Sequence, residues 1–421
     1  MYKIILFLFI PFISIYLEEI NLEFPASTKL RREEYKLEMQ NTIYSEILAY
    51  SKKMDERLVK KSFEYMQILN YLEEDGYQFL KMILTEYPTK SENFYSAALE
   101  ASYTLYETGF EEEMENILSL TTNLKHFAIV SNFILRKNPN EKGNHLKLLQ
   151  TKFKNSEKNP MVKILSQYLN SPPVEHLSKR PPIKDLFSHN FGEGRFILFS
   201  LQRLNRDYPG LLIIKNSDGK FIRREDGSIF SISQLARSIS DLPSYVVNGN
   251  TPQGIFSIQK IKTVKSDVIG PTPAVITALP FEVSPDIFFH TSTKSKKWKI
   301  ESYLNLFPVS WRFYFPIQEA FIAGEIGRSG IYAHGTTVDT EFYADYSYYP
   351  NTPTRGCLSA KEIWSKKTGK SIYSDQVSLL KVLKNFDPTK GYMIVIELDD
   401  QQNPVSLDEV LMDILEVEEA L

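Results

Sequence analysis

The sequence predicts an α+β multidomain protein in which a helical domain precedes a β-rich domain. Three observations carry this prediction. Apolar residues recur at helical spacing over residues 20–169. Beyond a proline-rich stretch, short β-prone runs alternate with Asp-Gly turn signals. A chain of 421 residues also exceeds what one ordinary core accommodates, so two or more domains are expected.

Residues 20–169 are expected to form the α-helical domain. Ile47, Met54 and Leu58 are spaced by seven and four positions, with charged residues between them. The segment "SAALEASYTLYETGFEEEMENIL" predicts a helix, a turn at Gly109 and a second helix. The helix breaks have no constant period, so a plain bundle and a stack of helical repeats both stay open.

Residues 170–189 are expected to be a linker, because "NSPPVEHLSKRPPIKD" holds four prolines. Residues 190–400 are expected to form the β-rich domain, with hairpin turns at Asp218-Gly219 and Asp226-Gly227. Strands are predicted at 255–258, 287–289, 309–317, 330–333 and 392–398, and short helices at 233–239 and 376–383. Residues 401–421 are expected to be an acidic C-terminal helix that opens on the capping box "SLDE".

Residues 1–19 bear on the compartment. Lys3 is followed by an apolar run from Ile4 to Leu17, after which acidic residues return. About 14 apolar residues suit a signal peptide and fall short of the ~20 that a spanning helix needs. The residues before Glu18 are not small, so an uncleaved membrane anchor stays open. The sequence therefore predicts an exported protein of the periplasm or cell envelope.

Composition excludes several function classes. The formal net charge is −3, from 49 basic and 52 acidic side chains, so no global attraction to nucleic acid is expected. Cys357 is the only cysteine, which excludes an internal disulfide and any cysteine-based zinc or iron–sulfur site.

Cys357 itself has two interpretations, a small buried hydrophobe or a nucleophile. Gly356 before it permits tight backbone geometry, and "SAKEIW" after it has a helical pattern. The thiol is therefore expected at a helix N-terminus, where free N–H groups favour a thiolate. Among six histidines, the candidate base is His334, which ends an apolar β-run and is followed by Gly335.

Three stretches place these residues in a wider pattern. They are "NGNTPQGIFSI" (248–258), "GIYAHGTT" (330–337) and "TPTRGCLSA" (352–360). In this order they resemble the Thr-Pro-x-Gly-x-Phe, His-Gly and Ser/Thr-x-Gly-Cys elements of the L,D-transpeptidase catalytic-domain (YkuD-like) family of cell-wall enzymes. The resemblance covers about half of the chain, from 195 to 398, and implies an L,D-transpeptidase-like fold for the β-rich domain.

The resemblance implies a cysteine acyltransferase. Cys357 would attack the carbonyl between the third residue and the terminal D-alanine of a peptidoglycan stem, and His334 would carry the proton. The carbonyl of Gly335 would orient the imidazole, and backbone amides around Arg355, Gly356 and Cys357 would form the oxyanion hole. The thioester would pass to an amine, giving a 3→3 cross-link or attachment to a protein. No metal or organic cofactor is implied.

Two departures from the family stand out. The family often has an arginine two residues after the cysteine, where this chain has Ser359. Arg355 would supply part of that charge from the other side. The separation of His334 and Cys357, 357 − 334 = 23 residues, is also longer than usual. Its tyrosine-rich stretch at 339–351 is either a mobile surface loop or a lid over the substrate.

Four residues are candidates for contacts with the stem peptide: Tyr332, Thr354, Ser359 and Arg312. In a regular strand Tyr332 points to the same side as His334, which leaves a cleft-wall role and a packing role open. Arg312 lies on the predicted strand at 309–317, which precedes the His-Gly strand.

Three functions stay open. The first is an L,D-transpeptidase of peptidoglycan biosynthesis and cell shape, whose thiol reacts with carbapenems as is typical of the family. The second is an L,D-carboxypeptidase or hydrolase of the same fold, with water as acceptor. The third is an inactive peptidoglycan-binding scaffold whose helical domain recruits a protein partner. The expected partners are peptidoglycan stem peptides and, through the helical domain, a protein; no nucleic acid is expected.

Overall fold

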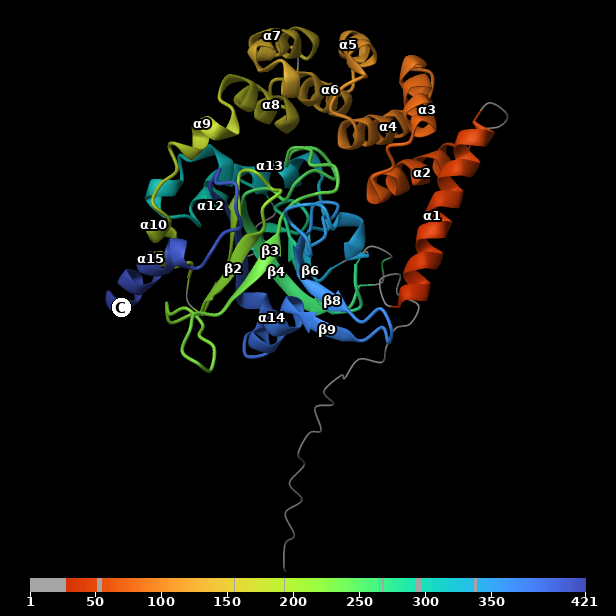
Figure 1. Ribbon diagram of the computed structural model, residues 1–421. Coiled ribbons are helices and arrows are strands. Elements are labelled where there is room, and N and C mark those ends of the chain that lie inside the picture. Colours follow the sequence, from red (N-terminus) through yellow and green to blue (C-terminus); the bar gives the residue numbers. More distant parts are fainter. Residues whose placement is uncertain are drawn as a thin grey trace, which may run out of the picture.

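The computed structural model describes residues 28–50, 55–154, 156–192, 194–264, 266, 269–292, 297–336 and 339–421. The predicted signal or anchor at 1–19 lies outside these residues. Within them, helices α1 to α8 form a helical region, and the rest of the chain forms a β-rich region built on a closed eight-stranded barrel (Figure 1). The α+β prediction, with helices first and strands second, is therefore confirmed.

The helical region contains α1 (Lys29–Ala49), α2 (Glu56–Leu69), α3 (Glu74–Thr85), α4 (Glu92–Leu105), α5 (Glu111–Leu120), α6 (Leu124–Lys137), α7 (Lys142–Lys152) and α8 (Pro160–Asn170). Side-chain caps start several of them: Ser91 accepts from the amide of Phe94, and Asn159 accepts from the amide of Met161. The turn predicted at Gly109 separates α4 from α5, as expected.

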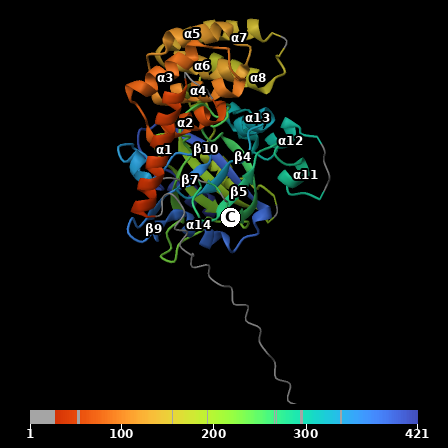
Figure 2. The same ribbon diagram turned by 90° about the vertical axis from the view of Figure 1, so that its right-hand side faces the viewer.

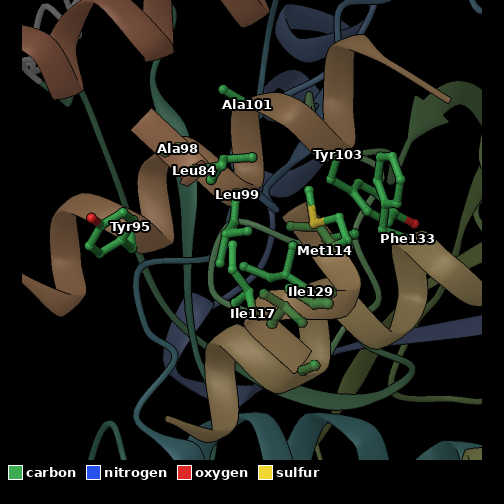
Figure 3. Packing of buried hydrophobic residues seen from close by; sticks show 14 of the residues in the cluster. Leu84, Tyr95, Ala98, Leu99, Ala101, Tyr103, Met114, Ile117, Ile129 and Phe133 are labelled. Atoms are coloured by element: carbon green, nitrogen blue, oxygen red, sulfur yellow. The ribbon is translucent and has the colours of Figure 1, made fainter. Parts of the chain in front are cut away.

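The helices of this region pack as consecutive pairs, and one helix of each pair contacts the next pair. α1 contacts α2, α5 contacts α6 and α7 contacts α8, while α2, α4 and α6 join successive pairs. Leu84, Leu99 and Ile117 come from three different helices and meet in one buried cluster (Figure 3). This connectivity favours stacked helical pairs over a plain bundle.

The barrel strands are β1 (Phe196–Arg203), β2 (Gly210–Lys215), β3 (Ser231–Leu235), β4 (Gly254–Lys262), β5 (Ala274–Ala278), β6 (Tyr332–His334), β7 (Leu358–Ala360) and β10 (Gly391–Asp399). Their order is β1-β10-β4-β5-β6-β7-β3-β2, and β1 pairs with β2 to close the ring. β1 runs parallel to β10, and β6 runs parallel to β7. The short strands β8 (Glu362–Trp364) and β9 (Ser371–Ser374) form a separate hairpin.

Both faces of β1 are covered. Its residues alternate between two hydrophobic clusters: Leu198 belongs to one, and Ile197 and Phe199 to the other. Strands buried on both faces appear in the sequence as continuous apolar runs, and the run "YMIVIEL" of β10 was predicted as a strand on this pattern. The remaining helices are α9 (Pro173–Leu177), α10 (Ile183–Ser188), α11 (Pro285–Phe288), α12 (Ile300–Leu304), α13 (Glu319–Ile326), α14 (Asp375–Leu383) and α15 (Asp408–Glu419).

The proline-rich segment at 170–189 is not an open linker. It includes α9 and α10, and the side chains of Ile183, Leu186 and Phe187 are buried in a barrel-side cluster. Proline fits the first turn of a helix because its missing N–H has no partner there, and Pro173 occupies such a position. The predicted C-terminal helix is present as α15, and Ile414 buries it against the same cluster.

Three predictions of secondary structure in the β-rich region, outside the segment at Cys357, are wrong. The helix expected at 233–239 is instead the end of β3 followed by irregular chain. The strand expected at 287–289 is replaced by α11, which starts at Pro285. The strand expected at 309–317 consists of two 3₁₀ turns, because Pro308 and Pro316 set helical turns there. Trp311 is buried and Phe313 is exposed, so the two residues do not share a face.

The helical region is seated on one end of the barrel, and α1 extends down its side (Figures 1 and 2). Leu242, Tyr245 and Val246 of the β-rich region belong to the hydrophobic cluster of the helical region, so the two regions share a core. At the start of α1, Arg32 forms a buried ion pair with Asp339, with 2.7 Å between Nη1 and Oδ1.

Candidate active site

His334 ends strand β6 and is almost fully buried. Its Nδ1 lies 2.7 Å from the carbonyl oxygen of Gly335. A carbonyl only accepts, so Nδ1 carries the proton and Nε2 is left as the basic nitrogen. Burial lowers the pKa of the imidazole to about 4, although the Gly335 carbonyl acts in the opposite direction. The imidazole is therefore neutral at pH 7.

Cys357 lies on the chain directly before β7, the parallel neighbour of β6. In this register His334 faces Ser359, so the cysteine lies two residues before the position opposite the imidazole. The Tyr332 amide donates to Sγ at 3.3 Å, and the thiol donates to the Gly330 carbonyl at 3.4 Å. The thiol is 8% exposed. Among the described residues, the thiol and the imidazole share no hydrogen bond.

The expectation of a helix after Cys357 is wrong. "SAKEIW" forms the strands β7 and β8 instead, because Leu358 and Ala360 are buried in the barrel and pair with its neighbouring strands. Tertiary packing overrides the helical propensity of this segment. The thiol consequently receives no stabilisation from a helix N-terminus.

The pKa values of Cys357 and His334 indicate that both side chains are neutral in the resting protein. Burial raises the pKa of the Cys357 thiol to about 11, and the charge of Glu282 adds to this. The Tyr332 amide and the Arg328 guanidinium act in the opposite direction. Because the pKa of the thiol lies far above that of His334, a thiol and a neutral imidazole are favoured over a thiolate–imidazolium pair. With a neutral thiol and a neutral imidazole at rest, the thiol proton has to move to His334 during nucleophilic attack.

This gives a pH prediction for the isolated protein. We expect the rate of Cys357 alkylation by iodoacetamide to rise about tenfold per pH unit up to about pH 10, because the thiolate is the reactive form and its pKa is raised. In urea the same thiol should titrate near its ordinary value of about 8.5. The chain has a single cysteine, so the measured rate belongs to it alone. A plateau below pH 8 in the folded protein would show a preformed ion pair and contradict the prediction.

The backbone around Gly356 is held by two threonines. Thr354 Oγ1 accepts from the Gly356 amide at 3.1 Å and donates to the Cys357 carbonyl at 2.7 Å. Thr251 Oγ1 donates to the Gly356 carbonyl at 2.9 Å. The Gly356 amide, one of the expected oxyanion donors, is thus occupied by Thr354.

Arg355 is turned away from the thiol. Its Nη2 lies 2.7 Å from Oε2 of Glu64, a residue of α2, and both side chains are about half exposed. Next to it, the side-chain amide of Asn248 lies 3.2 Å from both carboxylate oxygens of Glu100 in α4. The helix α2 therefore binds Arg355, two residues before Cys357, and α4 binds Asn248 of the β-rich region, which places the helical region beside the candidate site.

The other candidate residues fall into two groups. Tyr332 contacts the thiol through its backbone amide, and Ser359 is buried opposite His334 with Oγ bound to the Thr352 carbonyl at 2.6 Å. Arg312 is not brought to this site: it follows a 3₁₀ turn and its Nε donates to the Phe307 carbonyl at 3.0 Å.

The tyrosine-rich stretch at 339–351 is packed rather than open. Tyr343 and Tyr348 are buried in a small cluster with Leu235 of β3, and the guanidinium of Arg237 lies 5.3 Å from the centre of the Tyr348 ring. Tyr346 stacks on Tyr348. These rings cover the β3 side of the barrel.

Sequence reasoning missed Arg328. This residue follows α13, is 5% exposed, and interacts electrostatically with Cys357. The only signal was its place in "GRSGIYAHG", directly before the histidine strand.

A cavity of about 410 Å³ lies between the helical region and the barrel. Its walls include Thr251, Glu319 and Glu397, but neither Cys357 nor His334. Within the described ranges, no group of three or more side chains is arranged to hold a metal ion, and no helix is long and apolar enough to cross a bilayer.

No protein-family model, curated protein or solved structure matches this chain.

Proposed function

We propose that the chain is an L,D-transpeptidase-like cysteine acyltransferase of cell-wall peptidoglycan. The observation that carries this proposal is the His334 imidazole, held by its Nδ1–H on the Gly335 carbonyl, one strand away from the only thiol of the chain. A backbone carbonyl in this place does for the imidazole what a carboxylate does in a serine protease triad. It fixes the tautomer whose Nε2 accepts a proton.

The reaction follows from these groups. Sγ of Cys357 attacks the carbonyl between the third residue and the terminal D-alanine of a stem peptide, while Nε2 of His334 takes the thiol proton. The tetrahedral intermediate collapses, the C–N bond breaks, and the imidazolium returns the proton to the departing amine. An amine of a second stem, or of a protein, then attacks the thioester and releases the thiol.

The burial of the Cys357 thiol affects which acceptor, an amine or water, is favoured in the second step. A site that excludes water favours transfer to an amine over hydrolysis. Because the thiol is closed in the present conformation, the donor stem has to open the segments around it. In this proposal the N-terminal apolar run places the protein in the periplasm or cell envelope, and the helical region offers a surface for a protein partner.

The test is intact-mass spectrometry after incubation with a carbapenem. We expect a single adduct on the wild-type chain and none on Cys357→Ala. Muropeptides from cells that express either form should differ by 3→3 cross-linked dimers, whereas a carboxypeptidase would give shortened stems without new dimers. A folded wild-type chain that stays unmodified, with no change in muropeptides, overturns the proposal.

A second candidate, an inactive peptidoglycan-binding scaffold, is favoured by one observation. The thiol is buried, and its pKa is raised to about 11, which suits a structural cysteine. If this function is correct, Cys357→Ala should leave the cellular phenotype of the wild-type gene unchanged.

A further inference from the structure

Arg328 is a buried cation whose hydrogen bonds, within the described part of the chain, go to backbone carbonyls. Its Nη1 donates to the carbonyls of Ser244 and Asn250, and its Nη2 donates to that of Gly249 at 2.9 Å. All three acceptors are neutral. In the part of the chain that the structure describes, no carboxylate lies within ion-pair distance of the guanidinium. Burial lowers the pKa of Arg328 to about 10, which reflects the cost of keeping this charge from water.

Two other buried arginines of the β-rich region show the usual arrangement. Arg203 pairs with Asp399 and Glu409, and Arg206 pairs with Glu397, each at 2.8 Å. Buried charges are normally compensated in this way. Among the described residues, Arg328 therefore has no direct ion pair of the kind that Arg203 and Arg206 have, and the charge of Glu319 acts on it without such a contact.

The guanidinium lies against the backbone of the candidate nucleophile. A Cβ on Gly356 would be 2.4 Å from Nη2 of Arg328, so nothing separates the two groups. The next residue is Cys357, whose charge interacts with that of Arg328 in both directions. Besides Glu319, whose charge also acts on Arg328, the anion that this arginine can compensate is the one that forms when the thiol ionises or an oxyanion develops beside it.

We propose that Arg328 is the fixed cation that stabilises the thiolate of Cys357 as it forms, which makes it a positioning residue for the nucleophile. The proposal rests on the proposed function for its place in a reaction. When the thiol proton moves to Nε2 of His334, the negative charge on sulfur is met by a guanidinium already in place, which keeps its own protons. In the family that the chain resembles, an arginine often lies two residues after the cysteine, where this chain has Ser359. Arg328 thereby supplies the positive charge that this position lacks.

The first test measures the thiolate directly in Arg328→Gln. Alkylation of Cys357 by iodoacetamide between pH 8 and 10.5 should be at least tenfold slower than in the wild type at every pH. Arg328→Lys, which keeps the charge but not the forked geometry, should recover most of the rate. Arg180→Gln is the matched control, because Arg180 is also largely buried and donates to the backbone carbonyls of Leu398 and Pro181. Its rate should equal that of the wild type.

Equal loss of rate in Arg328→Gln and Arg328→Lys would show that the arginine only holds the loop at 244–250, and would overturn the proposal. An unchanged rate in Arg328→Gln would do the same.

The second test leaves Arg328 in place and so does not depend on the folding of its variants. Cys357→Asp puts a permanent anion where the thiolate would form, and Cys357→Asn is its neutral counterpart. With a cation facing this position, the aspartate variant should unfold in urea at pH 8 at a midpoint equal to or above that of the asparagine variant. A clearly lower midpoint for the aspartate variant would mean that no cation compensates the charge.

These measurements separate the two proposals. Iodoacetamide alkylation and urea unfolding need no stem peptide and no carbapenem. If they succeed while the carbapenem adduct is absent, the acyltransferase function fails and the role of Arg328 stands. The reverse result would remove Arg328 from the mechanism and leave the function intact.

Discussion

In His334→Gln, the carbapenem should acylate Cys357 about 10²- to 10⁴-fold more slowly than in the wild type, the range typical of a lost general base. The reason lies in the two pKa values: the thiol, at about 11, is almost wholly protonated at pH 7, and the imidazole, at about 4, is free to accept its proton. Glutamine fills part of the same space and can still bind the Gly335 carbonyl, but it cannot take a proton. Intact-mass spectrometry over time gives the rate.

The control is His189→Gln. His189 is another imidazole whose pKa is lowered by burial and whose ring nitrogen binds a backbone carbonyl, that of Leu306 at 3.0 Å. Its loss should leave acylation unchanged.

A second measurement separates an effect on the reaction from an effect on the structure. Alkylation of His334→Gln by iodoacetamide at pH 10 should stay near the wild-type rate, because this reagent reacts with preformed thiolate. Acylation of His334→Gln at a rate within threefold of the wild type would remove His334 from the role of base.

The parts of the fold that could be predicted are those whose sequence pattern is local. The strands β4 and β10, the two Asp-Gly turns and the helices α14 and α15 carry their own signals of β-branched runs, turn residues or helical spacing. The segment at 309–317 shows why others failed. Its alternating aromatic residues imitate a strand, while flanking prolines and the burial of Trp311 set 3₁₀ turns instead.

The candidate site was predictable only in part, because it depends on pairings between distant segments. The sequence placed His334 at a strand end, but its position beside Cys357 comes from the parallel register of β6 and β7. The same pairing turns "SAKEIW" into strands and removes the expected helix terminus. Arg328 was invisible for the same reason, since its three carbonyl partners lie 78 to 84 residues earlier in the chain.

Gly356→Ala should destabilise the protein by about 2–5 kcal/mol. The glycine has a φ of +106°, a conformation that costs an L-residue about 1–2 kcal/mol. Its new methyl group would also lie 2.4 Å from Nη2 of Arg328 and 2.8 Å from the carbonyl oxygen of Gly249. Overpacking of a buried site typically adds about 1–3 kcal/mol. The free energy of unfolding in urea gives the total.

Gly227→Ala separates these two contributions. Gly227 has a φ of +85° at a hairpin turn, and nothing lies within 4 Å of the position where its Cβ would be. Alanine there should therefore cost only the backbone part, about 1–2 kcal/mol. The excess in Gly356→Ala belongs to the contacts beside the thiol.

Because one of these contacts is the Arg328 guanidinium, Gly356→Ala combined with Arg328→Gln should be more stable than the sum of the single changes predicts, by about 1 kcal/mol. If the two changes in stability are strictly additive, the guanidinium of Arg328 does not contact the methyl group at position 356. That result would contradict the close contact between Arg328 and the backbone next to Cys357.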